Sequence, residues 1–442
     1  MNRLLLLRLA IWVLPAASLY ALLLTRKRSR PLFAAVVLGL LWNAAALLAI
    51  NVIALRLEWW SFHQAVPAFM EVAIEPWVGW TILWTAVSLL AEERLVAPML
   101  LAVGWLDLLA MPLLQPLVVL DDSWLVGEML SLVCVFVPGL LLVRWTLHRT
   151  HLKARLSLQI ICASLLLLWI VPSVALGQTS AWDSVFQLPT WRFGIILQLV
   201  LIPAILGVRA AIEFAEKGQG TPLPYDPPSR VVTSGPYSYV RNPMQLSMVL
   251  IFLVGGIVLW NGWLLAAAFV AFVYGAGLAE WHEDVQLFER FNDVWTSYRA
   301  SVRAWVPRWR PAVSEPSTLL VAYSCGTCSS IGRWFLTRDP VGLEIAAAED
   351  SNDPELRRVT YVPADGPSQR GVIAIARALE HIHLGWAIVG WVLATPVVSH
   401  FAQLVVDVFG PTPHAVAGLP YDTAACSIQP EHTRTIASAK AH

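Results

Sequence analysis

Long apolar segments separated by short polar loops recur through the first 280 residues of the chain. A membrane-spanning helix needs about 20 mainly apolar residues. Nine segments meet this condition, at residues 4–24, 31–55, 74–91, 96–119, 124–146, 156–176, 192–213, 244–260 and 262–279. The pattern predicts a polytopic α-helical membrane protein with about nine transmembrane helices. The first segment lacks a convincing cleavage site, so we expect a retained span rather than a signal peptide.

Composition agrees with a membrane protein. Hydrophobic residues make up 57% of the 442 residues and charged residues only 14%, against about 25% charged in soluble domains. Many of the 22 tryptophans lie near predicted span ends, where an indole ring suits the headgroup level. This composition predicts the lipid bilayer as a partner. The formal net charge is zero, so we expect no nucleic-acid partner.

Basic residues are concentrated in alternate loops. The segments 26–30, 144–155 and 209–241 are rich in Lys and Arg, whereas the loops after the fourth and sixth predicted spans are poor in them. Loops rich in Lys and Arg stay in the cytoplasm. We therefore expect an integral, multi-pass protein of the cell membrane with its N-terminus outside and its C-terminal region in the cytoplasm.

Two polar blocks flank the last pair of predicted spans, at residues 218–244 and 280–307. Only Asn261 and Gly262 separate these spans, which predicts an antiparallel helical hairpin with both blocks on the cytoplasmic side. Together the blocks could enclose a small polar ligand. The residues alone leave a plainer alternative open, a stiff amphipathic linker beside an ordinary cluster of juxtamembrane charges.

The charged groups of these blocks suit a zwitterionic ligand. Arg241 carries a fixed charge in a planar fork that matches a carboxylate. Glu280, Glu283 and Asp284 could pair with an ammonium group and with ribose hydroxyls.

The order of the residues resembles the membrane methyltransferases, which include isoprenylcysteine carboxyl methyltransferase and phospholipid N-methyltransferase. The resemblance covers about residues 192–307. The first motif, G-P-Y-x-x-x-R-N-P-M, is matched by Gly235, Pro236, Tyr237, Arg241, Asn242 and Pro243. The second is matched by Glu283, Asp284, Leu287, Phe291, Tyr298, Val302 and Pro307. The sequence departs from the family pattern at four positions: Gln245 replaces an aromatic residue, Asp284 the commoner Glu, Asn292 a Gly and Trp295 a Tyr.

The resemblance implies S-adenosylmethionine as the methyl donor, bound on the cytosolic side between the two motifs. It implies direct methyl transfer to a lipid-like, prenyl or other hydrophobic acceptor. We place Arg241 and Glu283 on opposite walls of the site as its catalytic residues, and name no residue as a base. The cofactor-binding residues are then Gly235, Pro236, Tyr237, Arg241, Asn242, Pro243, Glu280, Glu283, Asp284 and Tyr298.

The composition changes after Pro307. The pattern predicts an α/β unit with strands at 318–324, 341–347 and 357–362 and helices at 325–338 and 371–382. The apolar stretch 383–409 is long enough for a tenth span, but Pro396, His400 and Asp407 interrupt it. We favour helices of the α/β unit there. The domains expected are a transmembrane bundle at 1–180, a methyltransferase-like part at 190–310, the α/β unit at 316–410 and a disordered tail at 411–442.

A C-x-x-C motif, Cys325-Gly326-Thr327-Cys328, lies between the first predicted strand and helix of this unit. A helix N-terminus lowers a thiol pKa, so Cys325 would attack and Cys328 would resolve. A zinc site would need two more ligands, and there is no second C-x-x-C, so we expect no metal. Residues 318–410 resemble the thioredoxin-like thiol-disulfide oxidoreductases named after an Asp-Cys-Cys signature, but Ala322-Tyr323-Ser324 lacks the usual Asp. Redox activity, with a thiol reductant or redox partner protein, and a degenerate docking domain both stay open.

The leading hypothesis is therefore an integral-membrane methyltransferase with an appended cytosolic C-x-x-C domain. Two alternatives remain. In the first, the protein is a membrane-anchored thiol-disulfide oxidoreductase whose methyltransferase-like part is only an anchor. In the second, it is a non-enzymatic membrane scaffold.

Overall fold

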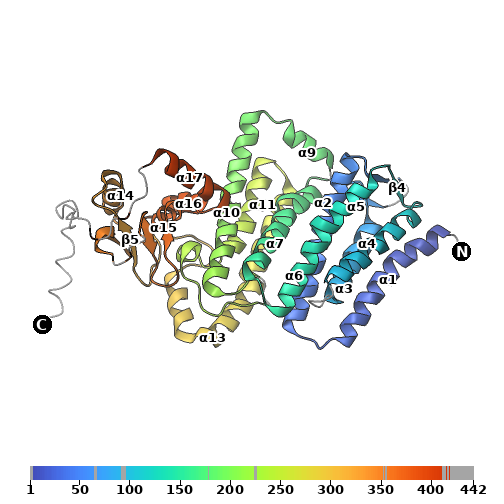
Figure 1. Ribbon diagram of the computed structural model, residues 1–442, viewed down its shortest axis with the longest axis horizontal. Coiled ribbons are helices and arrows are strands. Elements are labelled where there is room, and N and C mark those ends of the chain that lie inside the picture. The colour runs from blue at the N-terminus through green and yellow to red at the C-terminus, as the bar shows by residue number, and fades with distance from the viewer. Residues whose placement is uncertain are drawn as a thin grey trace. The chain divides into compact units, whose positions relative to one another are not determined.

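The computed structural model describes residues 3–63, 67–90, 96–177, 179–222, 226–351, 353, 356–410, 415 and 418. The chain is mostly helical (Figure 1). It divides into two compact units. The first comprises Met1–Val200, Phe214–Arg230 and Met248–Val273, and the second comprises Leu201–Glu213, Val231–Ser247 and Tyr274–His442.

The N-terminal helices belong to the first unit. They are α1 (Arg3–Thr25), α2 (Arg30–Arg56), α3 (Ile74–Leu90), α4 (Val96–Leu113), α5 (Trp124–Ser131), α6 (Val137–His148), α7 (Leu152–Leu165), α8 (Val171–Ala175) and α9 (Thr179–Phe186). The π-helical turns η2 (Leu132–Phe136) and η3 (Leu166–Ile170) continue α5 into α6 and α7 into α8. Two short antiparallel pairs join β1 (Trp60–Phe62) to β4 (Val118–Leu120) and β2 (Ala68–Phe69) to β3 (Val72–Ala73).

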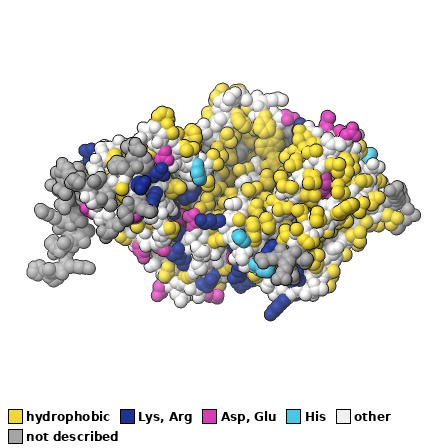
Figure 2. Space-filling view, in the orientation of Figure 1, with side chains coloured by type: hydrophobic (Ala, Val, Ile, Leu, Met, Phe, Trp, Pro, Cys, Tyr) yellow, Lys and Arg dark blue, Asp and Glu magenta, His cyan; other side chains and the backbone are white. Residues whose placement is uncertain are grey.

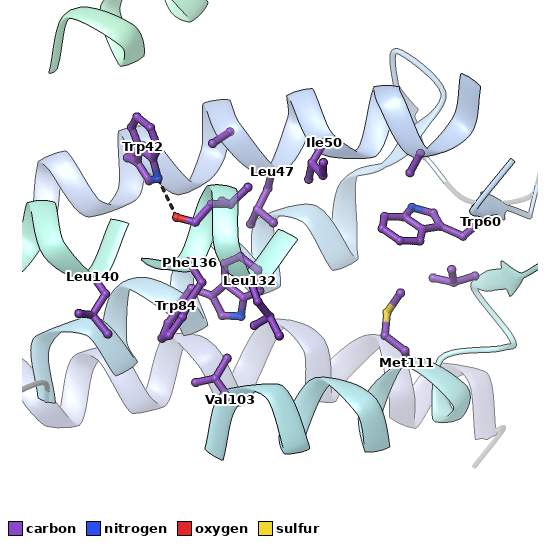
Figure 3. Close-up of a cluster of buried hydrophobic side chains, with 14 of the residues drawn as sticks. Trp42, Leu47, Ile50, Trp60, Trp84, Val103, Met111, Leu132, Phe136 and Leu140 are labelled. Carbon is purple, nitrogen blue, oxygen red and sulfur yellow. Dashed lines mark hydrogen bonds between the residues drawn. The ribbon is translucent and has the colours of Figure 1, made fainter. Parts of the chain in front are cut away.

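Local sequence explains where α2 begins. The Ser29 hydroxyl accepts a hydrogen bond from the backbone N–H of Leu32 (3.3 Å), and a proline occupies the first helical turn. Both features suit a helix N-terminus. The helix then packs into an aromatic core, in which Trp42 Nε1 donates to the carbonyl of Val135 (2.9 Å) and Trp84 meets Phe136 edge to face (Figure 3).

The outer faces of this unit suit lipid. Leu101, Trp105 and Leu109 of α4 are spaced four residues apart and all are exposed. Four-residue spacing puts them on one side of the helix. Figure 2 shows hydrophobic side chains gathered over this part of the molecule.

Six helical stretches are long and apolar enough to cross a membrane, judged by length and composition over the described residues. They are Leu4–Thr25, Arg30–Arg56, Val96–Leu113, Trp124–His148, Leu152–Ala175 and Thr190–Gly218. A bent helix pair near the C-terminus would make a seventh. The protein is thus a multi-pass helical membrane protein. The count of nine stays a prediction, because the other predicted spans fall on shorter helices.

The predicted span at 96–119 is wrong at its C-terminal end. α4 ends at Leu113, and Val118–Leu120 forms β4 instead. Pro112 and Pro116 explain the difference, because proline lacks the N–H that a helix needs and clashes with the preceding turn.

Three further helices have parts in both units: α10 (Thr190–Gly218), α11 (Pro243–Val258) and, almost wholly in the first, α12 (Gly262–Tyr274). The predicted hairpin of α11 and α12 is confirmed, with a connection of residues 259–261. A Cβ on Gly256 would lie 2.7 Å from the Leu265 side chain, so the two helices touch. α12 continues through the π-helical turn η5 (Gly275–Ala279) into α13 (Glu280–Ser301).

The C-terminal part of the second unit is an α/β structure. Its elements are β5 (Ser317–Val321), α14 (Gly326–Leu336), β6 (Leu343–Ala347), η6 (Ala348–Asp350), β7 (Thr360–Val362), β8 (Gln369–Arg370), α15 (Val372–Leu379), α16 (Leu384–Leu393) and α17 (Pro396–Phe409). The sheet order is β6-β5-β7-β8. β5 pairs in parallel with β6 and antiparallel with β7, which pairs antiparallel with β8. Each strand and helix predicted here overlaps an observed one, whereas the short elements η6 and β8 were not predicted.

The ambiguous stretch 383–409 forms two helices bent by 84°, α16 and α17. α16 buries Ala387, Gly390 and Trp391. α17 exposes Val397 and Phe401. The stretch is therefore not one continuous helix, and the preference for helices of the α/β unit over a tenth span stays a prediction. The expected disordered tail lies outside the described residues, apart from residues 415 and 418.

Candidate functional site

The site begins where the chain turns after α10 into the first motif. Gly235 has a φ of +59° and starts a short 3-10 helix, η4 (Gly235–Ser238). A Cβ at this position would lie 3.0 Å from the carboxylate carbon of Glu213. Only glycine adopts this conformation without cost and also leaves room for the carboxylate. Glu213 in turn accepts a hydrogen bond from the Ser234 hydroxyl (2.5 Å).

Backbone hydrogen bonds join the two motifs. The N–H of Arg241 donates to the carbonyl of Arg303 (2.9 Å), and the N–H of Asn242 donates to that of Ala304 (3.2 Å). The buried Tyr298 hydroxyl donates to the carbonyl of Tyr237 (2.9 Å). Segments about 60 residues apart in sequence thus lie side by side, as the motif order predicts.

Arg241 lies at the centre of this junction. Its side chain is largely buried and forms an ion pair with Glu280 at the start of α13. Its guanidinium carbon lies 5.7 Å from the centre of the Trp295 ring. The second carboxylate oxygen of Glu280 accepts a hydrogen bond from Trp305 Nε1 (3.1 Å). Glu280 therefore holds the Arg241 guanidinium in place and is itself held by the indole of Trp305.

The acid that pairs with Arg241 is Glu280, which was predicted as a ligand for the cofactor. The predicted opposite wall, Glu283, lies in α13, but its side chain is outside the described part of the structure. The placement of Arg241 and Glu283 on opposite walls of the site therefore stays a prediction.

Two buried donors near Arg241 have no hydrogen-bond partner among the described residues. They are Asn242 Nδ2 and Trp295 Nε1. A buried donor left unpaired costs free energy. An anionic ligand such as a carboxylate would satisfy donors of this kind, so the residues present fit a zwitterionic cofactor. Asn242 leads directly into α11, whose first residue is Pro243.

α13 folds back on itself at Asn292, whose φ of 38° and ψ of −109° break the helix. The fold brings Arg299 within 3.0 Å of Asp284. Burial raises the pKa of Asp284, while the charges of Arg299 and Arg241 work against that rise. Asn tolerates a positive φ better than most residues other than Gly. The departure from the family's glycine at this position is thus explained.

Gln245 is the departure that most threatens the packing of the cofactor. A Cβ on Gly275 in η5 would lie 3.2 Å from Gln245 Oε1 and 2.7 Å from the Trp305 ring. The amide therefore packs beside the indole that holds Glu280. An aromatic ring is present at this wall, supplied by Trp305 rather than by position 245.

A buried charge cluster in the same unit was missed by the sequence analysis. Arg377 of α15 lies 2.6 Å from Glu213 of α10 and 3.0 Å from Glu380. All three side chains are buried. The Tyr239 hydroxyl donates to the backbone carbonyl of Glu380 (2.7 Å), and burial raises the pKa of Tyr239. The signal available in sequence was an arginine and a glutamate inside an otherwise apolar helical pattern, A-I-A-R-A-L-E.

The C-x-x-C motif lies at the N-terminus of α14, as predicted. Cys325 is the N-cap residue, and both cysteines are free thiols that are partly exposed. Burial, the hydrogen bond that the Cys328 thiol donates to Cys325, and electrostatic repulsion from Cys325 and Glu349 raise the pKa of Cys328 to about 12. Cys325 and Cys328 line an apolar cavity of about 180 Å³, together with Ile331, Val372 and Val406.

Glu349 is a second residue that the sequence analysis missed. Its carboxylate accepts from the N–H (2.8 Å) and hydroxyl (2.6 Å) of Ser324 and from the N–H of Tyr323 (3.2 Å). Burial would raise the pKa of Glu349, but the hydrogen bonds from Ser324 outweigh it and the pKa is lowered. Because β5 and β6 are parallel, the residues that follow them meet at one sheet edge. That rule could have identified Glu349.

Among the residues that the structure describes, no three His, Cys, Asp or Glu side chains gather in a way that could hold a metal ion.

The central part of the chain is similar to a known protein family. Residues 193–292 match the family model described as phospholipid methyltransferase. Searches of curated proteins and of solved structures found no match. The matched segment contains α11, α12, the first motif and the start of α13. This part of the chain is therefore methyltransferase-like, within a multi-pass membrane protein.

Proposed function

We propose that the protein is an integral-membrane methyltransferase that uses S-adenosylmethionine to methylate a lipid-like or other hydrophobic acceptor. The observation that carries the proposal is the junction of the two motifs at Arg241, a residue within the segment 193–292 that matches the phospholipid methyltransferase family model. The proposed orientation puts this junction on the cytoplasmic side, with the N-terminus outside.

The residues of the junction have separate roles in this proposal. Arg241 would hold the carboxylate of the methyl donor, and the unpaired amide of Asn242 would donate to it. Glu280 and Asp284 would hold its ammonium group and ribose hydroxyls, with Glu283 beside them. Gly235, Pro236 and Tyr237 shape the turn that presents Arg241, and Tyr298 fixes that turn through its bond to Tyr237. Pro243 starts the helix at the edge of the site.

Catalysis in this site depends mainly on alignment. The sulfonium supplies an activated methyl group, so the protein needs to position donor and acceptor and exclude water. The buried Tyr298 hydroxyl and the Trp295 ring provide a dry wall for this purpose. Burial also raises the pKa of Tyr298, which keeps its hydroxyl a donor.

Binding of S-adenosylmethionine to the protein in lipid nanodiscs, measured by calorimetry, tests the proposal. Arg241→Lys should weaken binding at least tenfold, because a lysine cannot form a two-pronged bond to a carboxylate. Arg303→Lys is the matched control, since Arg303 is exposed and the substitution keeps the backbone carbonyl that accepts from Arg241. Equal affinities of both variants and the natural protein would contradict the proposal.

A second activity, thiol-disulfide exchange by the C-x-x-C unit, has its own support. The strand order β6-β5-β7-β8, with Cys325 capping the helix after β5, is an arrangement expected of a thioredoxin-like domain. A thiol reductant or partner protein would then reduce a Cys325–Cys328 disulfide. Loss of insulin-disulfide reduction in Cys325→Ser tests this activity. If neither S-adenosylmethionine binding nor disulfide reduction is found, the scaffold alternative remains.

A further inference from the structure

Two acids are buried together in the N-terminal bundle, away from the site described above. Asp107 of α4 is fully buried, and Glu128 of α5 is 5% exposed. Their carboxyl groups lie within hydrogen-bonding reach of each other when one carries a proton. Trp80 Nε1 donates to Asp107 Oδ1 (2.9 Å). Asp107 Oδ2 and Glu128 Oε1 are buried with no hydrogen-bond partner in the described part of the chain.

The pair has no basic neighbour to balance its charge. Over the described residues, no Lys, Arg or His nitrogen forms an ion pair with Asp107 or Glu128. Glu75 of the same bundle, by contrast, has its charge balanced by a basic side chain, because Arg8 lies 2.7 Å from its carboxylate. An ionised carboxylate here would carry an unbalanced charge, which is costly inside a membrane protein and which a bound cation would balance.

Glu128 lines a cavity of about 50 Å³ whose walls include four indole rings beside aliphatic side chains. Trp60, Trp77, Trp80 and Trp84 all contribute. Figure 3 shows Trp60 and Trp84 in the cluster that contains this cavity. Gly127, next to Glu128, has no Cβ and so lets the Trp60 ring approach its backbone.

Hydrogen bonds fix the orientation of three of these rings. Trp60 Nε1 donates to Asn51 Oδ1 (3.0 Å) and Trp77 Nε1 donates to the carbonyl of Ala44 (2.8 Å), in addition to the bond from Trp80 to Asp107. Their N–H groups are therefore engaged by the protein. An indole face turned toward the cavity would attract a cation.

We propose that this cavity binds the ammonium group of an organic cation. A buried carboxylate supplies the opposite charge and the indole rings supply cation–π contacts. Anions are excluded by the acid pair, and the volume suits an ammonium group rather than a complete phospholipid headgroup. The cation is either a free amine or the amine of a membrane amphiphile. The proposal does not depend on the proposed methyltransferase activity.

Thermal unfolding of the full chain in nanodiscs tests the proposal. Choline is compared with 3,3-dimethylbutan-1-ol, its neutral analogue of the same shape. Choline at a hundred times its Kd should raise the unfolding midpoint by about 3 °C, and the alcohol should not. A rise only with hexadecyltrimethylammonium at low mole fraction in the nanodisc lipid, and not with choline, would identify the membrane amphiphile as the source.

Glu128→Gln keeps the shape and removes the carboxyl group that lines the cavity, so it should abolish the response to either cation. Asp122→Asn, at an exposed site, is the matched control and should keep the response. Asp107→Asn is the second variant if Glu128→Gln does not fold. Without ligand, Glu128→Gln should unfold at a temperature no lower than the natural protein, because a buried carboxyl group without a basic partner has been removed. Equal responses in Glu128→Gln and the natural protein, or no response to either cation, would overturn the proposal. A midpoint that responds to pH but to neither cation would indicate a proton site and overturn it as well.

Discussion

Arg377 of α15 lies 2.6 Å from Glu213 of α10, and both side chains are buried within the second unit. α10 is a candidate membrane span, whereas α15 belongs to the C-terminal α/β structure. The same Glu213 accepts from Ser234 and occupies the space left by the missing side chain of Gly235. One carboxylate thus connects the turn before the first motif to the α/β structure.

Removing one partner of this pair should be strongly destabilising. Glu213→Gln leaves the Arg377 charge buried and less well balanced, and breaking a buried pair costs about 3–5 kcal/mol. The free energy of unfolding of Glu213→Gln in detergent should fall by about this amount. Arg377→Met in the Glu213→Gln background should recover part of the loss. Strictly additive losses in the double variant would show that the two side chains are not coupled.

The turn at Gly235 should be sensitive to a single methyl group. Gly235→Ala forces a φ of +59° on a residue with a Cβ and pushes that Cβ against Glu213. We expect a loss of about 1–3 kcal/mol in the free energy of unfolding. Gly326→Ala is the control, because a Cβ there meets no atom within 4 Å. Losses of equal size in both variants would contradict the account of this turn.

Acid should destabilise the protein through His381. Burial lowers the pKa of this imidazole to about 4, against about 6.5 in the unfolded chain. Between these values the unfolded chain binds more protons, so the free energy of unfolding falls as the pH falls from 6.5 to 4. The loss from this residue is roughly 3 kcal/mol. The slope of stability against pH should be shallower in His381→Gln, and an unchanged slope would refute the assignment.

The two thiols of the C-x-x-C motif should react at different rates. Because the pKa of Cys328 is raised to about 12, it stays protonated at pH 8, and only thiolates react readily with iodoacetamide. Peptide mass spectrometry after brief alkylation should show Cys325 modified well before Cys328. Equal modification of the two cysteines would contradict the different environments described above.

Much of the fold is readable from the sequence because lipid imposes long apolar segments and polar loops. The hairpin of α11 and α12 follows from the short connection at residues 259–261. Prolines outweighed hydrophobicity at the end of α4, where composition alone predicted a longer span. The two-residue β8 is too short to produce a pattern.

The motif order predicted which segments of the site meet, but not which side chains pair. Spacing along α13 is ambiguous, because Glu280, Glu283 and Asp284 lie within about one turn and any of them could face Arg241. The pairing with Glu280 depends on Trp305, which reaches it from beyond the end of the helix. The cluster of Glu213 and Arg377 depends on tertiary contacts between residues 164 positions apart, from 213 to 377. No local pattern carries that information.

The central claim is that the junction of the two motifs binds S-adenosylmethionine. The most direct measurement is calorimetric titration of S-adenosylmethionine into the protein in nanodiscs, with Arg241→Lys and Arg303→Lys in parallel. The account predicts saturable binding to the natural protein and to Arg303→Lys, and at least tenfold weaker binding to Arg241→Lys. No saturable binding to the natural protein, or equal binding to all three proteins, would contradict it.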